Sequence, residues 1–300
     1  MDTTLFVFYG NEFHISHLIG AVLYILLAPF LGGFITGVDR RVTARMQGRY
    51  GPPILQPFYD VNKLFGKERI TVSSGQDFYV LCSLIFMIIS GTFFFGGGNL
   101  LMMIFTLTAS AVFLVLAGFS SNSPFAQLGA EREMLQIMSY EPMVLLAAVG
   151  FYMVNGSFSV GDIIMSDVFS FPYLIGMFIG YIFILTIKLR KSPFDLSMSH
   201  HAHQELVKGL TTEMSGRTLA MLEIIHWYET VFLLGFVFLF FARGSFAYTI
   251  LGIGVAIACY FAEILIDNGY ARMKWKFTLK SAWLVTLIFG GGNLFILYYL

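Results

Sequence analysis

Several ionisable side chains lie inside long apolar stretches, and they are the residues most able to do chemistry in this sequence. Glu223, His226 and Glu229 are three residues apart, so a helix would place them on one face within an arc of about 120°. Glu141 lies inside another apolar stretch. A charged side chain at membrane depth costs about 3 kcal/mol unless it faces a polar interior. The pattern favours a proton or ion path over static pairing, although Glu229 could pair with a nearby cation.

Five further acidic residues extend this set. Asp195, Glu205 and Glu213 lie in one long polar segment, and Glu263 and Asp267 are four residues apart at the end of an apolar stretch. We expect Asp267 to be the solvated end of a helix. The other four join the candidates for the ion path.

The segment Ser199–His203 contains three histidines, and three imidazoles could bind a transition metal. Neighbouring side chains diverge on a helix, however, and no cysteine is near enough to complete a site. Cys82 and Cys259 lie far apart in apolar stretches and are too few for a zinc or iron–sulfur site. We therefore expect no metal ligands, cofactor-binding residues or catalytic residues in this chain, and place His200, His201 and His203 at a subunit contact.

The composition is that of an integral membrane protein. Apolar residues make up 57% of the chain and charged residues 12%, whereas soluble domains carry about 25% charged residues. The formal net charge of zero argues against a nucleic-acid partner. Runs of about 20 apolar residues predict an all-α bundle of eight transmembrane helices within a single domain, residues 1–300. The predicted spans are residues 15–38, 78–95, 100–119, 135–154, 171–187, 219–241, 246–266 and 281–299.

Basic residues predict the orientation of these helices. The loops after the first, third, fifth and seventh spans lie on one side and hold every lysine and arginine except Arg243. The positive-inside rule places these long loops in the cytoplasm, with both termini outside and the protein in the cell membrane. The first long loop also contains Ile54–Phe65, where apolar and polar residues alternate at roughly helical spacing. This segment could lie on the membrane surface or under a docked partner.

Several loop segments resemble, in order, those of the complex I membrane subunit that helps to form the quinone site. They are Gly51–Asp60, Lys63–Glu68, Gly129–Arg132, Ser139–Glu141, Ser192–Leu196, Glu205–Gly209 and Glu213, followed by Asn268, Ala271, Arg272 and Trp283. The resemblance covers most of the chain. It implies that acidic residues lie between the redox site and the membrane, namely Glu141, Asp195, Glu205, Glu213 and Glu223.

The segment Ser199–Leu206 departs from the quinone-reducing members, which tend to carry acidic and small residues there. It resembles the version in Ech-type, energy-converting [NiFe] hydrogenases. The resemblance implies a membrane subunit of an oxidoreductase complex with no redox site of its own, which anchors a ferredoxin-oxidising soluble arm and couples hydrogen evolution or uptake to movement of protons or sodium ions. Nickel–iron and iron–sulfur centres would belong to partner subunits.

The partners implied are the hydrogenase large and small subunits, an iron–sulfur subunit, an antiporter-like membrane subunit, membrane lipid and, indirectly, ferredoxin. Two alternatives remain: the corresponding subunit of a quinone-reducing complex, and a free-standing ion carrier, since carriers also hold intramembrane carboxylates. Long basic and aromatic loops favour docking over the carrier. Besides the three histidines, the candidates for subunit contact are Arg45, Arg49, Gln56, Asp60 and Lys63.

Overall fold

The structure is mainly helical, as the sequence predicts. The computed structural model describes residues 4–8, 11–68, 74–198 and 207–300. Within these residues, seven helices are long and apolar enough to cross a membrane. They are α1 (Ile15–Met46), α3 (Ser74–Phe95), α4 (Leu100–Phe119), α5 (Pro124–Asn155), α8 (Gly216–Leu239), α9 (Phe246–Gly269) and a last helix formed by α10 (Trp275–Val285), the π-helical turn η1 (Thr286–Gly291) and α11 (Gly292–Tyr299).

An eighth apolar helix, α7 (Ile175–Lys188), has 14 residues. At 1.5 Å per residue it is about 21 Å long, less than the roughly 30 Å of a bilayer core. Each predicted span therefore has a helix in the structure, and one of them is short. Two small helices, α2 (Gln56–Phe65) and α6 (Val160–Met165), lie in connections. An antiparallel hairpin of β1 (Thr4–Phe8) and β2 (Asn11–His14) precedes α1, and the sequence did not predict it.

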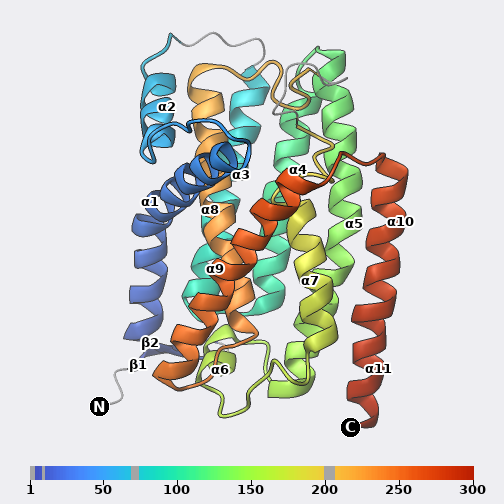
Figure 1. The fold of residues 1–300 in the computed structure, drawn as a ribbon. Coiled ribbons are helices and arrows are strands. Elements are labelled where there is room, and N and C mark those ends of the chain that lie inside the picture. Colours follow the sequence, from blue (N-terminus) through green and yellow to red (C-terminus); the bar gives the residue numbers. More distant parts are fainter. Residues whose placement is uncertain (1–3, 9–10, 69–73, 199–206) are drawn as a thin grey trace.

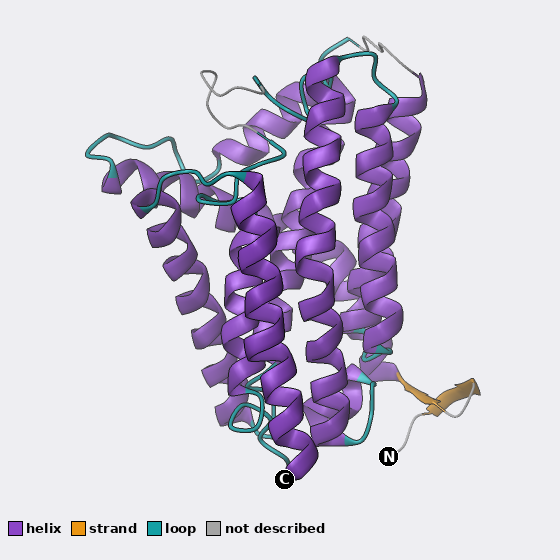
Figure 2. Cartoon of the chain, turned by 90° about the vertical axis from the view of Figure 1, so that its right-hand side faces the viewer, coloured by secondary structure: helices purple, strands orange, loops and turns teal. Residues whose placement is uncertain are grey.

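The long helices run side by side along one axis of the molecule (Figure 1). Both chain ends lie at the same end of the bundle, which an even number of crossings requires (Figures 1 and 2). We call this the terminal end. The opposite end, here called the loop end, carries α2 and the connection between α7 and α8.

Several predicted helices are longer in the structure than the sequence indicated, and α5 and α1 differ most. The predicted span 135–154 corresponds to α5, which begins at Pro124 and continues through Pro142. The segment Gly129–Arg132, which was predicted to lie in a loop, is therefore helical. Similarly, α1 continues past residue 38 to Met46. Hydropathy detects only the membrane-embedded part of a helix, so the polar turns that extend beyond it were missed.

A row of glycines on α1 brings α2 and α8 into direct contact with it. A Cβ atom at Gly32 would lie 2.3 Å from the Trp227 carbonyl oxygen of α8. A Cβ at Gly33 would lie 2.6 Å from the ring of Phe58 on α2. The Phe58 and Trp227 rings are themselves 5.1 Å apart. Close approach of helices through small residues is typical of membrane bundles, and it explains how α2 is held against the bundle.

Replacing Gly32 with alanine should destabilise the α1–α8 contact, because the new methyl group meets backbone atoms that cannot rotate away. We expect a loss of about 1–3 kcal/mol, seen as a lower thermal unfolding temperature of the purified protein in detergent. Gly254→Ala is the matched control, since a Cβ there has no atom within 4 Å among the described residues. Equal unfolding temperatures for the two variants would contradict this packing.

The core nearer the terminal end is aromatic. Tyr181 of α7 stacks on Phe236 of α8 with ring centroids 4.7 Å apart, and Phe151 of α5 lies 4.8 Å from Phe240. All four side chains are almost fully buried. Polar groups of α5, α7 and α8 gather instead beyond this cluster, towards the loop end.

Candidate functional site, a buried charge network at the end of α7

The short length of α7 places two basic residues deep in the bundle. Lys188 is the last residue of this helix and Arg190 follows it by two positions. Because α7 is shorter than its neighbours, its C-terminal end lies level with the interior turns of α5 and α8 rather than at their ends (Figure 1). The negative end of a helix dipole also favours cations at this position.

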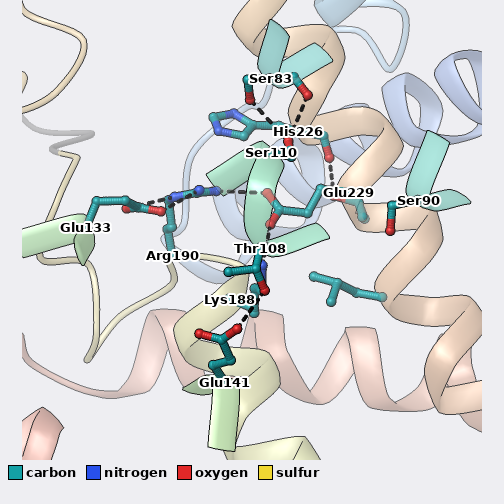
Figure 3. A network of polar contacts seen from close by, with 12 residues as sticks. Ser83, Ser90, Thr108, Ser110, Glu133, Glu141, Lys188, Arg190, His226 and Glu229 are labelled. Carbon is teal, nitrogen blue, oxygen red and sulfur yellow. Dashed lines mark hydrogen bonds and ion pairs between the residues drawn. The ribbon is translucent and has the colours of Figure 1, made fainter. Parts of the chain in front are cut away.

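Arg190 joins carboxylates from two other helices. Its Nη2 and Nε atoms lie 2.7 Å and 3.4 Å from the two carboxylate oxygens of Glu133 on α5, and its Nη1 donates to Glu229 of α8 at 3.0 Å. Lys188 donates to the other oxygen of Glu229 at 3.2 Å. These four residues, the charge network, converge in Figure 3. The forked guanidinium suits such a position because it can hold two carboxylates at once.

The charge network is buried and its formal charges balance. The exposed fraction of the four side chains is 10% or less. Burial opposes the charge on Arg190, but Glu133 and Glu229 raise its pKa above the usual value. The backbone of Arg190 has φ 51°, a left-handed conformation that costs a non-glycine residue about 1–2 kcal/mol. We infer that the two ion pairs offset this cost.

The connection that follows Arg190 is held by hydrogen bonds from several elements. Gln136 of α5 donates to the carbonyl of Phe194 at 2.7 Å. The carboxylate of Asp267 on α9 accepts from the Ser192 amide at 2.8 Å, and the Met273 amide donates to the Pro193 carbonyl. The segment is therefore fixed in the protein interior, and it positions Arg190 in turn.

Glu141 lies on α5 two turns beyond Glu133, in a different environment. Its carboxylate accepts a hydrogen bond from Thr108 of α4 at 2.8 Å (Figure 3). Within the described residues it has no ion pair, and it is only partly buried. Glu141 is therefore held by a neutral hydroxyl, whereas Glu229 is held by two cations.

A small cavity of about 10 Å³ adjoins the charge network. Arg190 and Glu229 line one part of it, and the hydroxyls of Ser83 and Ser110, 3.1 Å apart, line another. A space of this size holds about one water molecule, and these groups supply the polar partners that such a water needs. The cavity thus lies between the charge network and the serine hydroxyls of α3 and α4, and apolar side chains line the rest of it.

Comparison with known proteins identifies the family. A profile described as NADH dehydrogenase matches residues 19–298. The chain belongs to this family.

Curated members include both hydrogenase and quinone-reducing proteins. Hydrogenase-4 component C of Escherichia coli is 32% identical over 67% of this chain and 66% of its own length. A subunit of the NADH-quinone oxidoreductase of Rubrobacter xylanophilus is 31% identical over 69% of each chain. Formate hydrogenlyase subunit 4 of Escherichia coli is 27% identical over 89% of this chain and 93% of its own length.

A solved structure of the membrane-bound sulfane sulfur reductase, an archaeal respiratory membrane complex, contains a similar chain. That chain is 26% identical to this protein and superposes with a TM-score of 0.82. The match covers 94% of this protein and 100% of that chain. The family match and the structural similarity each extend over nearly the whole protein. The similar proteins are subunits of oxidoreductase complexes.

The acidic residues predicted for the ion path lie in different parts of the structure. Glu229 lies in the charge network, so the cation pairing that the sequence left open for it is present. Glu223 and His226 lie on the same helix, both partly buried. The structure places Asp195 in the buried connection after α7, and Glu213 before α8. Glu205 and the three histidines at 200, 201 and 203 lie outside the described residues.

The predicted subunit contacts fall into two groups. Arg45, Arg49 and Lys63 are exposed at the loop end. Asp60 instead pairs with Arg40 of α1 at 2.8 Å, and Gln56 donates to it at 2.9 Å. Asp60 thus helps to fasten α2 to α1, and Gln56 holds the Asp60 carboxylate from within α2.

Sequence reasoning missed Glu133, Lys188 and Arg190 as members of a site. The two basic residues were counted only as loop charges, and Glu133 was not selected. For Lys188 and Arg190 the available signal was their position beside the shortest predicted span, residues 171–187.

Proposed function

We propose that this chain is the membrane-anchoring and ion-coupling subunit of a ferredoxin-dependent, energy-converting [NiFe] hydrogenase complex. The observation that carries the proposal is the similarity to two hydrogenase-type proteins, one of which, formate hydrogenlyase subunit 4, matches along nearly the full length of both chains. The histidine-containing segment 199–206 supports the same branch of the family.

The ion-coupling part of the proposal rests on Glu141. Its carboxyl group is held by a neutral hydroxyl, whereas the nearby charge network is electrically balanced and buried. In our proposal Glu141 and Glu223 take up and release the ion, and the charge network fixes the helices around them. Asp195, Glu205 and Glu213 would connect this region to the redox arm.

We assign the nickel–iron and iron–sulfur centres to partner subunits. The described residues contain no group of three or more histidine, cysteine or acidic side chains placed to hold a metal. The two cysteines lie on separate helices, α3 and α9. The partners proposed are the hydrogenase large and small subunits, an iron–sulfur subunit and an antiporter-like membrane subunit.

A second candidate is the corresponding subunit of a quinone-reducing complex, which the 31% identity to a subunit of NADH-quinone oxidoreductase favours. Purification of the complex in mild detergent separates the candidates. The hydrogenase proposal predicts about one nickel per complex and hydrogen formation from reduced ferredoxin. Bound quinone without nickel would assign the protein to the second candidate, and reduction of sulfane sulfur without nickel would exclude both.

The basic loop end is proposed to face the cytoplasm and to dock the soluble arm. Arg45 and Arg49 are exposed there, so replacing both with glutamate should repel an acidic partner surface. We expect most of the hydrogenase activity to leave the membrane fraction and appear in the soluble fraction. Arg243→Glu, a charge reversal at the terminal end, is the control. Activity that stays membrane-bound in the double variant would refute this docking site.

A further inference from the structure

A further buried carboxyl group, which is not part of the charge network, lies on α9. Most of α9 presents apolar side chains to its surroundings, including Ile257 and Phe261. The helix buries four residues, and these are Gly252, Ala256, Glu263 and Ile264. Glu263 has no exposed surface at all. A carboxyl group buried so completely needs a physical explanation.

The contacts of Glu263 accommodate a neutral acid. Its Oε1 atom lies 3.2 Å from the hydroxyl oxygen of Thr186 on α7, and that hydroxyl also lies 3.4 Å from the Ile182 carbonyl. A threonine hydroxyl has one proton and can donate fully to only one acceptor. If Glu263 carries a proton on Oε1, it donates to Thr186, and Thr186 donates to Ile182. Both hydrogen bonds are then made.

The other carboxyl oxygen supports the same assignment. Oε2 of Glu263 is buried and has no hydrogen-bond partner among the described residues. In a carboxylate, this atom would share a full negative charge with no donor to stabilise it. In the neutral acid it is a carbonyl oxygen, for which a missing partner costs less.

Two charged groups, Lys191 and Asp267, act on Glu263, and the cation of the two is already engaged by other carboxylates. Lys191 is already bound to Asp39 of α1 at 2.7 Å, lies 4.0 Å from Asp267 and faces the ring of Tyr260 at 5.0 Å. One cation therefore already faces two carboxylates. An ionised Glu263 would add a third negative charge.

We propose that Glu263 is a proton-binding site of this chain, separate from Glu141. The proton reaches Glu263 from the loop end, by way of Asp267 and Lys191. The bound proton forms an O–H bond at the carboxyl group, and its release leaves a carboxylate. Asp267, with a 32% exposed side chain, connects the site to water. A metal ion does not suit the site, because Glu263 and Thr186 supply too few oxygen ligands. A role of this proton in ion coupling rests on the proposed function. Binding of the proton to Glu263 does not depend on that function.

Infrared difference spectroscopy of the purified complex tests the proposal without measuring turnover. The wild-type protein should show the carbonyl stretch of a protonated carboxylic acid, which Glu263→Gln removes. Thr186→Val, a near-isosteric change, should keep the band and shift its frequency, because the O–H group loses its acceptor. Glu141→Gln controls for the other carboxyl group and should leave this band in place.

An acid band of unchanged intensity in Glu263→Gln would overturn the proposal. If that variant does not assemble, the Thr186→Val spectrum decides, and an unshifted band contradicts the assignment. Failure of this test is distinct from failure of the proposed function, which is judged by nickel content and hydrogen formation.

Discussion

Replacing Arg190 with methionine should destabilise the protein more than Gly32→Ala does. The variant leaves Glu133 facing the interior without its cation and removes one of the two cations that hold Glu229. Breaking a buried ion pair from one side typically costs about 3–5 kcal/mol. We expect a sharply lower thermal unfolding temperature in detergent and a lower amount of protein in the membrane.

Two further variants show whether lost charge balance is the cause. In Glu133→Gln/Arg190→Met one carboxylate and one cation are removed together, so part of the stability should return. Arg190→Lys keeps the charge but cannot reach both carboxylates, and should lie between the wild type and the methionine variant. A double variant as unstable as Arg190→Met would show that packing, not charge balance, gives Arg190 its importance.

Replacing Glu141 with glutamine should separate redox chemistry from ion movement. The amide keeps the shape of the side chain and its hydrogen bond from Thr108, but it cannot bind or release a proton. Hydrogen formation by the purified complex in detergent should persist, because no metal ligand is altered. In sealed membranes, ion movement should fall to the level of a leak control.

The controls for Glu141→Gln lie on the same helix and in the same ion path. Glu131 is an exposed acidic residue of α5, so Glu131→Gln should leave both hydrogen formation and ion movement unchanged. Glu223→Gln should behave like Glu141→Gln if the two residues share one path. Loss of hydrogen formation in detergent would instead place Glu141 in the redox chemistry.

The helices could be predicted from the sequence because membrane insertion depends on local composition. A run of about 20 apolar residues must be a helix in lipid, since each backbone hydrogen bond has to be made within the segment. The polar extension of α5 before residue 135 lacked this signal, and so did the hairpin before α1. In these two segments water can satisfy the backbone hydrogen bonds, so their composition does not require a helix.

The charge network could not be predicted in the same way. Arg190 is separated by 57 residues from Glu133 and by 39 from Glu229, so no helical period relates them. The periodic spacing of Glu223, His226 and Glu229 located one face of α8 correctly, but it contained no information about the residues opposite. Those come from α5 and from the end of α7, and only the tertiary fold brings the three elements together.

The ratio of ions moved to hydrogen formed, measured in sealed vesicles that contain the purified complex, tests the role of Glu141 in coupling most directly. We expect a constant, non-zero ratio for the wild type and for Glu131→Gln. For Glu141→Gln we expect a ratio near zero with hydrogen formation retained. The same ratio in Glu141→Gln as in the wild type would show that ions do not pass by way of this carboxyl group, and would contradict the proposed coupling role.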